Sequence, residues 1–317
     1  SILLVTIDCL RADHVGAYGY KRRTTPVLDG LAAEGIRFTE SFSSASTTAP
    51  ALAQLYTSDA FPMPGQPTFL TPLAAAGVST AAITNGASWL AQSGVPFDEI
   101  VSGPFDATAI TDRAIDWLRR RPRTRFALHV HYGDACAPYA PPEPYARLFV
   151  DTTYPGPIGN VFADAGGDDR LYGTADRGRI VSLYDGAIRY VDGNVGRILE
   201  ILKGEERLKR TVVVVTADHG EELWDHGRLS EAHSLHDAQL HVPLVVRLPA
   251  AAHAGTVIGR LASTIDIAPA LLEWSGVTPP PPTFTGHSLA QSVARPDLPP
   301  DDLLASATTT RFQARYA

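Results

Sequence analysis

The chain has 317 residues, of which 44% are hydrophobic and 19% charged, so it can build a large packed core and is not a disordered protein. Its net charge of −7 argues against broad binding to duplex nucleic acid, and no window approaches the roughly 18 uninterrupted apolar residues of a membrane span. The two cysteines, Cys9 and Cys136, exclude a disulfide-built scaffold and a four-cysteine zinc module.

Short apolar runs alternate along the chain with segments of helical periodicity. The apolar runs predict strands at 2–7, 38–43, 79–84, 126–132, 211–216 and 242–247. Helices are predicted between them, at 26–35, 47–56, 70–76, 108–120, 180–202 and 265–274. This alternation indicates an α/β fold with a mostly parallel central sheet and helices on both faces. The Gly- and Asp-rich stretch 155–179 lacks periodicity and is predicted to be a surface insertion loop.

Polar side chains follow two of the predicted strands, at their carboxyl ends. Asp8 ends the first strand, and Asp218 and His219 come directly after the most apolar one. Thr48 lies at a predicted helix start, where free N–H groups and the helix dipole favour an anion. Ligands bind outside the carboxyl ends of parallel strands, so these four side chains are expected to converge on one divalent cation. The simpler alternative is that Asp8 caps a helix and His219 is a core residue.

Five segments resemble conserved blocks of the sulfatase family of the alkaline phosphatase superfamily, in the family's order. Two of them carry most of the resemblance, VTIDCLRADH at 5–14 and TADHGEEL at 216–223. The others lie at 131–139, 184–192 and 233–244. The resemblance covers nearly the whole chain and implies that family's α/β fold, with a C-terminal subdomain that is small or truncated here.

The same resemblance implies roles for individual residues. Asp8, Asp218 and His219 match ligands of one divalent metal ion, and the choice among Mn²⁺, Ca²⁺, Mg²⁺ and Zn²⁺ stays open. Thr48 matches the position of the family's catalytic Cys or Ser, which is oxidised to formylglycine. A threonine cannot undergo that oxidation, so Thr48 itself is implied as the nucleophile, as in superfamily members of the phosphoglycerol transferase type.

Several positions depart from the family pattern. Leu52 replaces an arginine, Asn85 stands where a lysine is usual, and Cys136 replaces a histidine that faces the transferred group. Asn85, Cys136 and His233 are nevertheless the positions that the resemblance implies for substrate binding. For Cys136, a soft ligand or reactive thiol is one interpretation, and a chance position at the rim of the site is the other.

Two functional hypotheses follow. The first is a metal-dependent hydrolase or transferase that acts on small phosphate or sulfate esters through Thr48, with phosphoryl chemistry favoured. The alternative is a degenerate family member that binds an anionic ligand or partner without turnover, which the changes at Leu52, Asn85 and Cys136 motivate. Neither hypothesis involves a nucleic-acid partner, and the oligomeric state is open.

The resemblance assigns 1–290 to the catalytic domain and 291–317 to the start of a C-terminal subdomain. Because Ser1 stands directly before an apolar strand and no initiator Met is present, we expect a trimmed N-terminus, and the family favours a periplasmic or extracellular location. Outside the site, Glu221, Glu222 and Asp225 are interpreted as a solvated helix face, and Asp266 as a helix cap.

Overall fold

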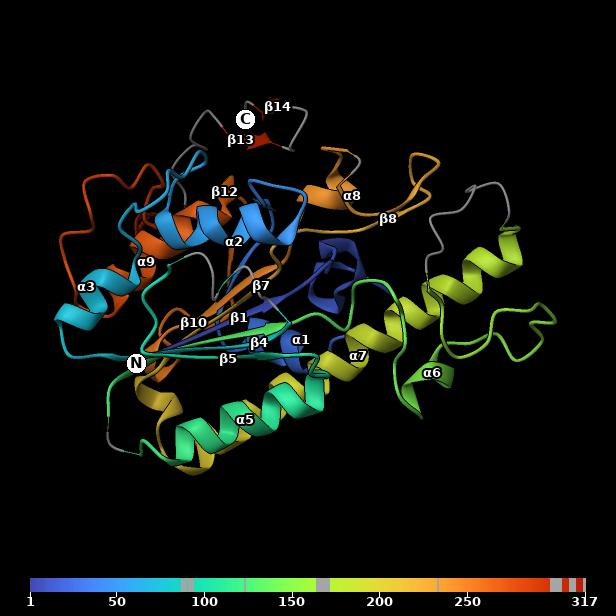
Figure 1. Ribbon diagram of the computed structural model, residues 1–317, viewed down its shortest axis with the longest axis horizontal. Helices are drawn as coiled ribbons and strands as arrows, with labels where there is room; N and C mark the ends of the chain where they lie inside the picture. Colours follow the sequence, from blue (N-terminus) through green and yellow to red (C-terminus); the bar gives the residue numbers. More distant parts are fainter. Residues whose placement is uncertain are drawn as a thin grey trace.

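A computed structural model describes residues 1–86, 90, 94–122, 124–163, 172–232, 234–296, 304–307 and 312–315. Its centre is an eight-stranded sheet in the order β11-β2-β10-β7-β1-β6-β4-β5 (Figure 1). The strands are β1 (Ile2–Ile7), β2 (Ile36–Phe38), β4 (Ser79–Asn85), β5 (Glu99–Gly103), β6 (Phe126–Tyr132), β7 (Val212–Thr216), β10 (Leu244–Arg247) and β11 (Thr256–Ile258). Only β10 runs antiparallel to its neighbours, so the mostly parallel sheet predicted from the sequence is confirmed.

Alternate residues of the central strands face two separate apolar layers. On β1, Leu3, Val5 and Ile7 belong to one layer, whereas Ile2 and Leu4 belong to the other. The first layer is covered by α1 (Pro26–Ala33), α5 (Ala107–Arg119) and α7 (Thr174–Gly204). The second is covered by α2 (Thr48–Thr57), α3 (Leu70–Ala75), α9 (Ile267–Trp274) and α10 (Leu289–Ala294). Burial on both faces explains why these strands read as continuous apolar runs (Figure 1).

Short elements surround this sandwich. The helices are α6 (Tyr145–Leu148) and α8 (Asp237–Leu240). Paired short strands are β3 (Ser41–Phe42) with β12 (Ala262–Ser263), and β8 (Glu222–Leu223) with β9 (Leu229–Ser230). Near the C-terminus, β13 (Leu304–Ala307) and β14 (Phe312–Arg315) form an antiparallel pair inside the segment assigned to a further subdomain, and that assignment stays a prediction. In the part of the chain that the structure describes, no helix has the length and apolarity needed to cross a membrane.

Most predicted elements are present, with three differences. The run at 38–43 is not one strand, because β2 pairs with β10 in the main sheet while β3 pairs with β12 outside it. Helix α7 begins at Thr174, so the last part of the predicted insertion at 155–179 is helical, and 164–171 lie outside the described residues. The edge strands β5 and β11 were not predicted, since each lies at one end of the sheet and carries exposed positions that break the apolar pattern.

Candidate active site

The predicted site residues lie at the carboxyl edge of the sheet. Asp8 follows β1, and Asp218 and His219 follow β7, which pairs with β1 in parallel. Thr48 is the first residue of α2, whose N-terminus therefore faces the same edge. Directly after Asp8 the backbone of Cys9 takes a left-handed conformation, with φ of 61°, and this turns the chain sharply away from the strand.

The four side chains form one cluster around the His219 ring. Its Nε2 lies 3.1 Å from Asp8 Oδ1, 3.3 Å from Thr48 Oγ1 and 3.7 Å from Asp218 Oδ2. The donor atoms of Asp8, Asp218 and His219 all lie within 4.8 Å of one another. On the other side of the ring, Nδ1 is 2.8 Å from the Gly220 carbonyl, to which it donates, so Nε2 is the nitrogen that faces the cluster. The convergence expected from the sequence is therefore present.

The charges of this cluster fit a divalent cation. Both carboxylate oxygens of Asp218 are buried and have no hydrogen-bond partner, which costs free energy unless a cation or a proton compensates. Burial and the neighbouring Asp8 carboxylate raise the pKa of Asp218 to about 8. Burial opposes a charge on His219 as well, but the surrounding carboxylates outweigh it and raise the pKa of that ring well above its usual value. Two carboxylates and one imidazole are suitable ligands for a dication.

Sequence reasoning missed one carboxylate of the site. Glu231, just after β9, places Oε2 2.8 Å from His219 Nε2. Its side chain is one-third exposed, so it reaches the cluster from the solvent side. The family blocks end before it and resume after it, and no local pattern distinguishes it from a surface glutamate.

A buried chain of hydrogen bonds connects the site with Tyr56, in the apolar layer beneath α2. Tyr56 Oη lies 2.6 Å from His129 Nδ1, and His129 Nε2 lies 2.8 Å from Thr6 Oγ1. Thr6 Oγ1 in turn lies 2.8 Å from His131 Nδ1, and His131 Nε2 faces Asp8 Oδ2 at 3.9 Å. Because a hydroxyl has one proton, every bond is satisfied when Tyr56 donates to His129, His129 to Thr6, and Thr6 to His131. This direction leaves the Nε2–H of His131 pointing toward Asp8.

We expect the substitution Thr6→Val to destabilise the protein by about 1–3 kcal/mol, because it leaves two buried imidazole nitrogens without a partner. Thr84→Val is the matched control, since the Thr84 hydroxyl is also buried in a central strand but has no hydrogen-bond partner. Urea unfolding of both variants measures the difference. Equal losses would show that the hydroxyl bridge at Thr6 contributes nothing.

Asn85, predicted to bind substrate, ends β4 at the same edge of the sheet and packs on Gly133, the residue after β6. A Cβ atom at Gly133 would lie 1.6 Å from Asn85 Nδ2, so any other residue at position 133 would displace the Asn85 amide from its present position. His233, the other such position, lies outside the described residues. Leu52, at the family's arginine position, is fully buried in the apolar layer beneath α2 and brings no charge to the site.

We expect Gly133→Ala to displace the Asn85 side chain and lower the melting temperature, because the added methyl overlaps it. Gly159→Ala serves as control, since a Cβ there meets no heavy atom within 4 Å. Thermal melting of both variants checks this expectation, and a Gly133→Ala protein that melts like the control would contradict it.

Two interpretations from the sequence are wrong. Cys9 and Cys136 form a disulfide, with Cα atoms 5.1 Å apart, so Cys136 is not a free reactive thiol in this structure; its contact with substrate stays a prediction. Glu221 and Glu222 do not lie on a solvated helix face, because both are buried, Glu221 directly before β8 and Glu222 as its first residue. Asp225 is partly exposed and pairs with Arg11.

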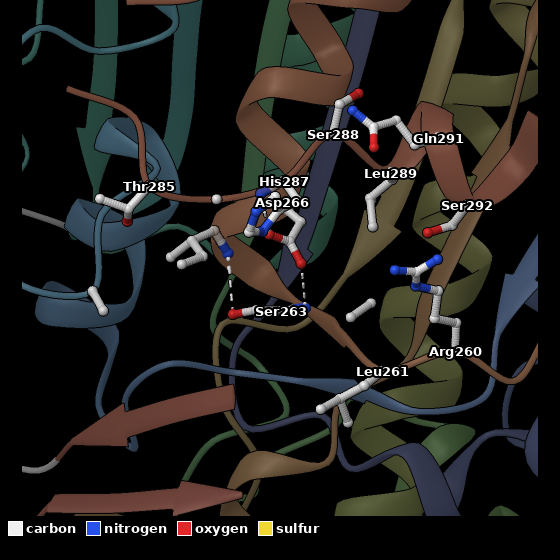
Figure 2. A pocket seen from close by; sticks show the side chains of 14 residues that line it. Arg260, Leu261, Ser263, Asp266, Thr285, His287, Ser288, Leu289, Gln291 and Ser292 are labelled. Carbon is white, nitrogen blue, oxygen red and sulfur yellow. Dashed lines mark hydrogen bonds between the residues drawn. The ribbon is translucent and has the colours of Figure 1, made fainter. Parts of the chain in front are cut away.

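A separate polar pocket of about 260 Å³ lies beside β12 and the start of α10 (Figure 2). Asp266 accepts hydrogen bonds from the backbone N–H groups of Ser263 and His287, each 2.8 Å long. With the Ser263 hydroxyl it forms a capping box on the 3-10 turn Thr264–Asp266, which leads into α9. The helix cap expected at Asp266 is therefore present on this turn, whereas at the start of α9 itself Asp266 makes no side-chain capping hydrogen bond.

The fold and the cluster together define a known class. The sulfatase family model matches residues 1–277, and the chain therefore belongs to the sulfatase family. It is 28% identical over 196 residues to the multifunctional alkaline phosphatase superfamily protein PehA of Trinickia caryophylli; the match covers 54% of this chain and 38% of that protein, well under half its length.

Solved structures agree on the fold. The phosphonate monoester hydrolase of Agrobacterium radiobacter superimposes with a TM-score of 0.78 at 21% identity, over 96% of this chain and 79% of that one. A protein solved with its substrate D-glucosamine-2-N,6-O-disulfate gives a TM-score of 0.84 at 20% identity, over 99% and 86% of the two chains. The fold and family expected from the sequence are thus confirmed.

Proposed function

We propose that the protein is a metal-dependent hydrolase or transferase of small anionic esters, with Thr48 as the nucleophile and phosphoryl transfer as the favoured chemistry. The observation that carries this proposal is the position of the Thr48 hydroxyl, 3.3 Å from both Asp8 Oδ1 and His219 Nε2 at the N-terminus of α2. An ester bound there would have its anionic group at the positive end of the helix dipole.

Each residue of the site has a separate role in the proposed reaction. Asp8, Asp218 and His219 would hold the cation, which when bound supplies charge neutralisation and lowers the pKa of a neighbouring hydroxyl. Thr48 donates its proton toward Asp8 Oδ1, which leaves a lone pair of Oγ1 free for attack. Attack on phosphorus forms the bond from Thr48 Oγ1 to phosphorus and breaks the bond to the ester oxygen. The alkoxide that leaves takes up the proton that Thr48 gave to Asp8 and departs as the alcohol. Water or an acceptor hydroxyl then displaces Thr48 and regenerates it.

Two further observations support the proposal. Thr48 cannot be converted to formylglycine, the group used by the sulfatases that the sequence resembles, and this favours phosphate or phosphonate over sulfate esters. One of the solved structures with the same fold is a phosphonate monoester hydrolase, so this fold is compatible with hydrolysis of phosphonate esters. The Cys9–Cys136 disulfide supports the proposed periplasmic or extracellular location, since such bonds persist in oxidising compartments.

Chromogenic phosphate, phosphonate and sulfate esters test the proposal, with the protein first chelated and then supplied with Mn²⁺, Mg²⁺, Ca²⁺ or Zn²⁺. We expect turnover of at least one phosphate or phosphonate ester that depends on added metal. A protein that binds inorganic phosphate but turns over no ester under any metal would support the alternative, an anion-binding member without catalysis. The loss of charge at Leu52 is the observation that favours that alternative.

A further inference from the structure

A second group of metal-binding donors lies beside the first and shares Asp8 with it. The donor atoms of Asp8, Cys9, Cys136 and Glu231 lie within 4.8 Å of one another. Cys9 and Cys136 are 127 residues apart in the sequence, so the fold brings the two sulfurs together from the loops that follow β1 and β6.

The surroundings of the two sulfurs are acidic. Cys9 Sγ lies 3.6 Å from Asp8 Oδ1, and Cys136 Sγ lies 3.8 Å from Glu221 Oε2. The Glu221 side chain is fully buried, and its Oε1 has no hydrogen-bond partner. A neutral disulfide gains nothing from carboxylates on both sides, whereas a dication held between two thiolates would be stabilised by them.

We propose that reduction of the Cys9–Cys136 disulfide creates a site for a soft divalent cation of the Zn²⁺ type, with Cys9, Cys136, Asp8 and Glu231 as ligands. A dithiol reductant supplies two electrons and two protons, which break the S–S bond and give two thiols. Binding of the cation then displaces the two thiol protons. Two sulfur and two oxygen ligands suit tetrahedral Zn²⁺, and its thiolates would lie about 3.8 Å apart, which two cysteines with Cα atoms 5.1 Å apart can reach by side-chain rotation.

The two donor groups compete for the carboxylate of Asp8, which belongs to both. A cation bound by the thiolates would draw Asp8 from the Asp218–His219 pair and Glu231 from His219 Nε2, which it contacts at 2.8 Å in the oxidised protein. The oxidised Cys9–Cys136 disulfide would therefore leave Asp8 to the cation site beside Thr48. Reduction would give Asp8 to the thiolate site, which does not include Thr48. Only this consequence for turnover rests on the proposed function, since the binding itself needs no catalysis.

Titration with Co²⁺, a spectroscopic substitute for Zn²⁺, tests the inference on the full chain. One sample is oxidised, and the other is reduced with a dithiol that is then removed without oxygen, with two free thiols per chain as the check. We expect a thiolate-to-cobalt charge-transfer band in the reduced protein and none in the oxidised one, and we expect Zn²⁺ to abolish the band. A reduced protein with two free thiols and no band would overturn the inference.

Matched variants separate this site from the first. Cys136→Ser and Cys9→Ser should lose the band, and Glu231→Gln should weaken Co²⁺ binding by the reduced protein. Asp218→Asn and Thr48→Ala should keep it, because neither residue belongs to the second group. A band that survives in Cys136→Ser would refute the ligand set, and circular dichroism shows that each variant is folded. If the band forms in the reduced protein and the oxidised protein turns over no ester, the proposed function fails while this inference stands; turnover by the oxidised protein with no band in the reduced one gives the reverse result.

Discussion

Thr48→Ala is expected to lower ester turnover by at least about 10³-fold, because it removes the proposed nucleophile while leaving the metal ligands in place. The melting temperature should hardly change, since Thr48 is only partly buried at the first position of α2. Single-turnover and steady-state assays of a chromogenic phosphate ester measure the first effect, and thermal melting measures the second.

Two variants control this experiment. Thr47→Ala alters the neighbouring helix-cap residue, whose hydroxyl makes no capping hydrogen bond, and it should retain turnover. Thr48→Ser keeps a hydroxyl at the site and should restore part of the activity that alanine loses. If Thr48→Ala turns over the ester as fast as the unsubstituted protein, a water molecule and not Thr48 attacks, and the covalent intermediate is excluded.

The main features of the fold could be predicted because burial acts on whole strands. The strands at Ile2–Ile7 and Phe126–Tyr132 are buried along their entire length, since each has strands on both sides and helices on both faces. Edge strands lack that constraint. β5 has a neighbouring strand on one side only and none of its residues is fully buried, so Glu99 and Ser102 are tolerated and the apolar signal disappears.

The centre of the site could be predicted for a related reason. Asp8 and His219 come directly after two adjacent parallel strands, and the register of such strands fixes where their carboxyl ends meet. Glu231 and the disulfide depend instead on how loops fold back over that edge. Residues 9 and 136 come together because of the turn after Asp8 and the loop after β6. No periodicity in the sequence predicts this contact.

Without the proposed metal ion, the stability of the protein is expected to fall as the pH rises. The Asp218 carboxyl has a pKa of about 8 in the folded chain, raised by burial and by Asp8, against an ordinary value of 3.8. Between these values the folded chain holds a proton that the unfolded chain has released, so stability is greatest at low pH and is lost as the pH approaches 8. Asp218 and His219, whose pKa is also raised, act in the same direction.

A bound cation replaces those protons, so the metal-loaded protein should keep its melting temperature where the chelated protein loses it. Melting from about pH 6 to about pH 9, with chelator and with excess metal, compares the two states. Asp218→Asn is the control, because its neutral side chain cannot titrate. In this variant the melting temperature should depend less on pH, and added metal should raise it less. A chelated protein that becomes more stable over this range would mean that the buried carboxyls of the folded chain hold no extra protons. The negative charge of Asp8 and Asp218 would then have to be balanced by something other than the cation inferred here.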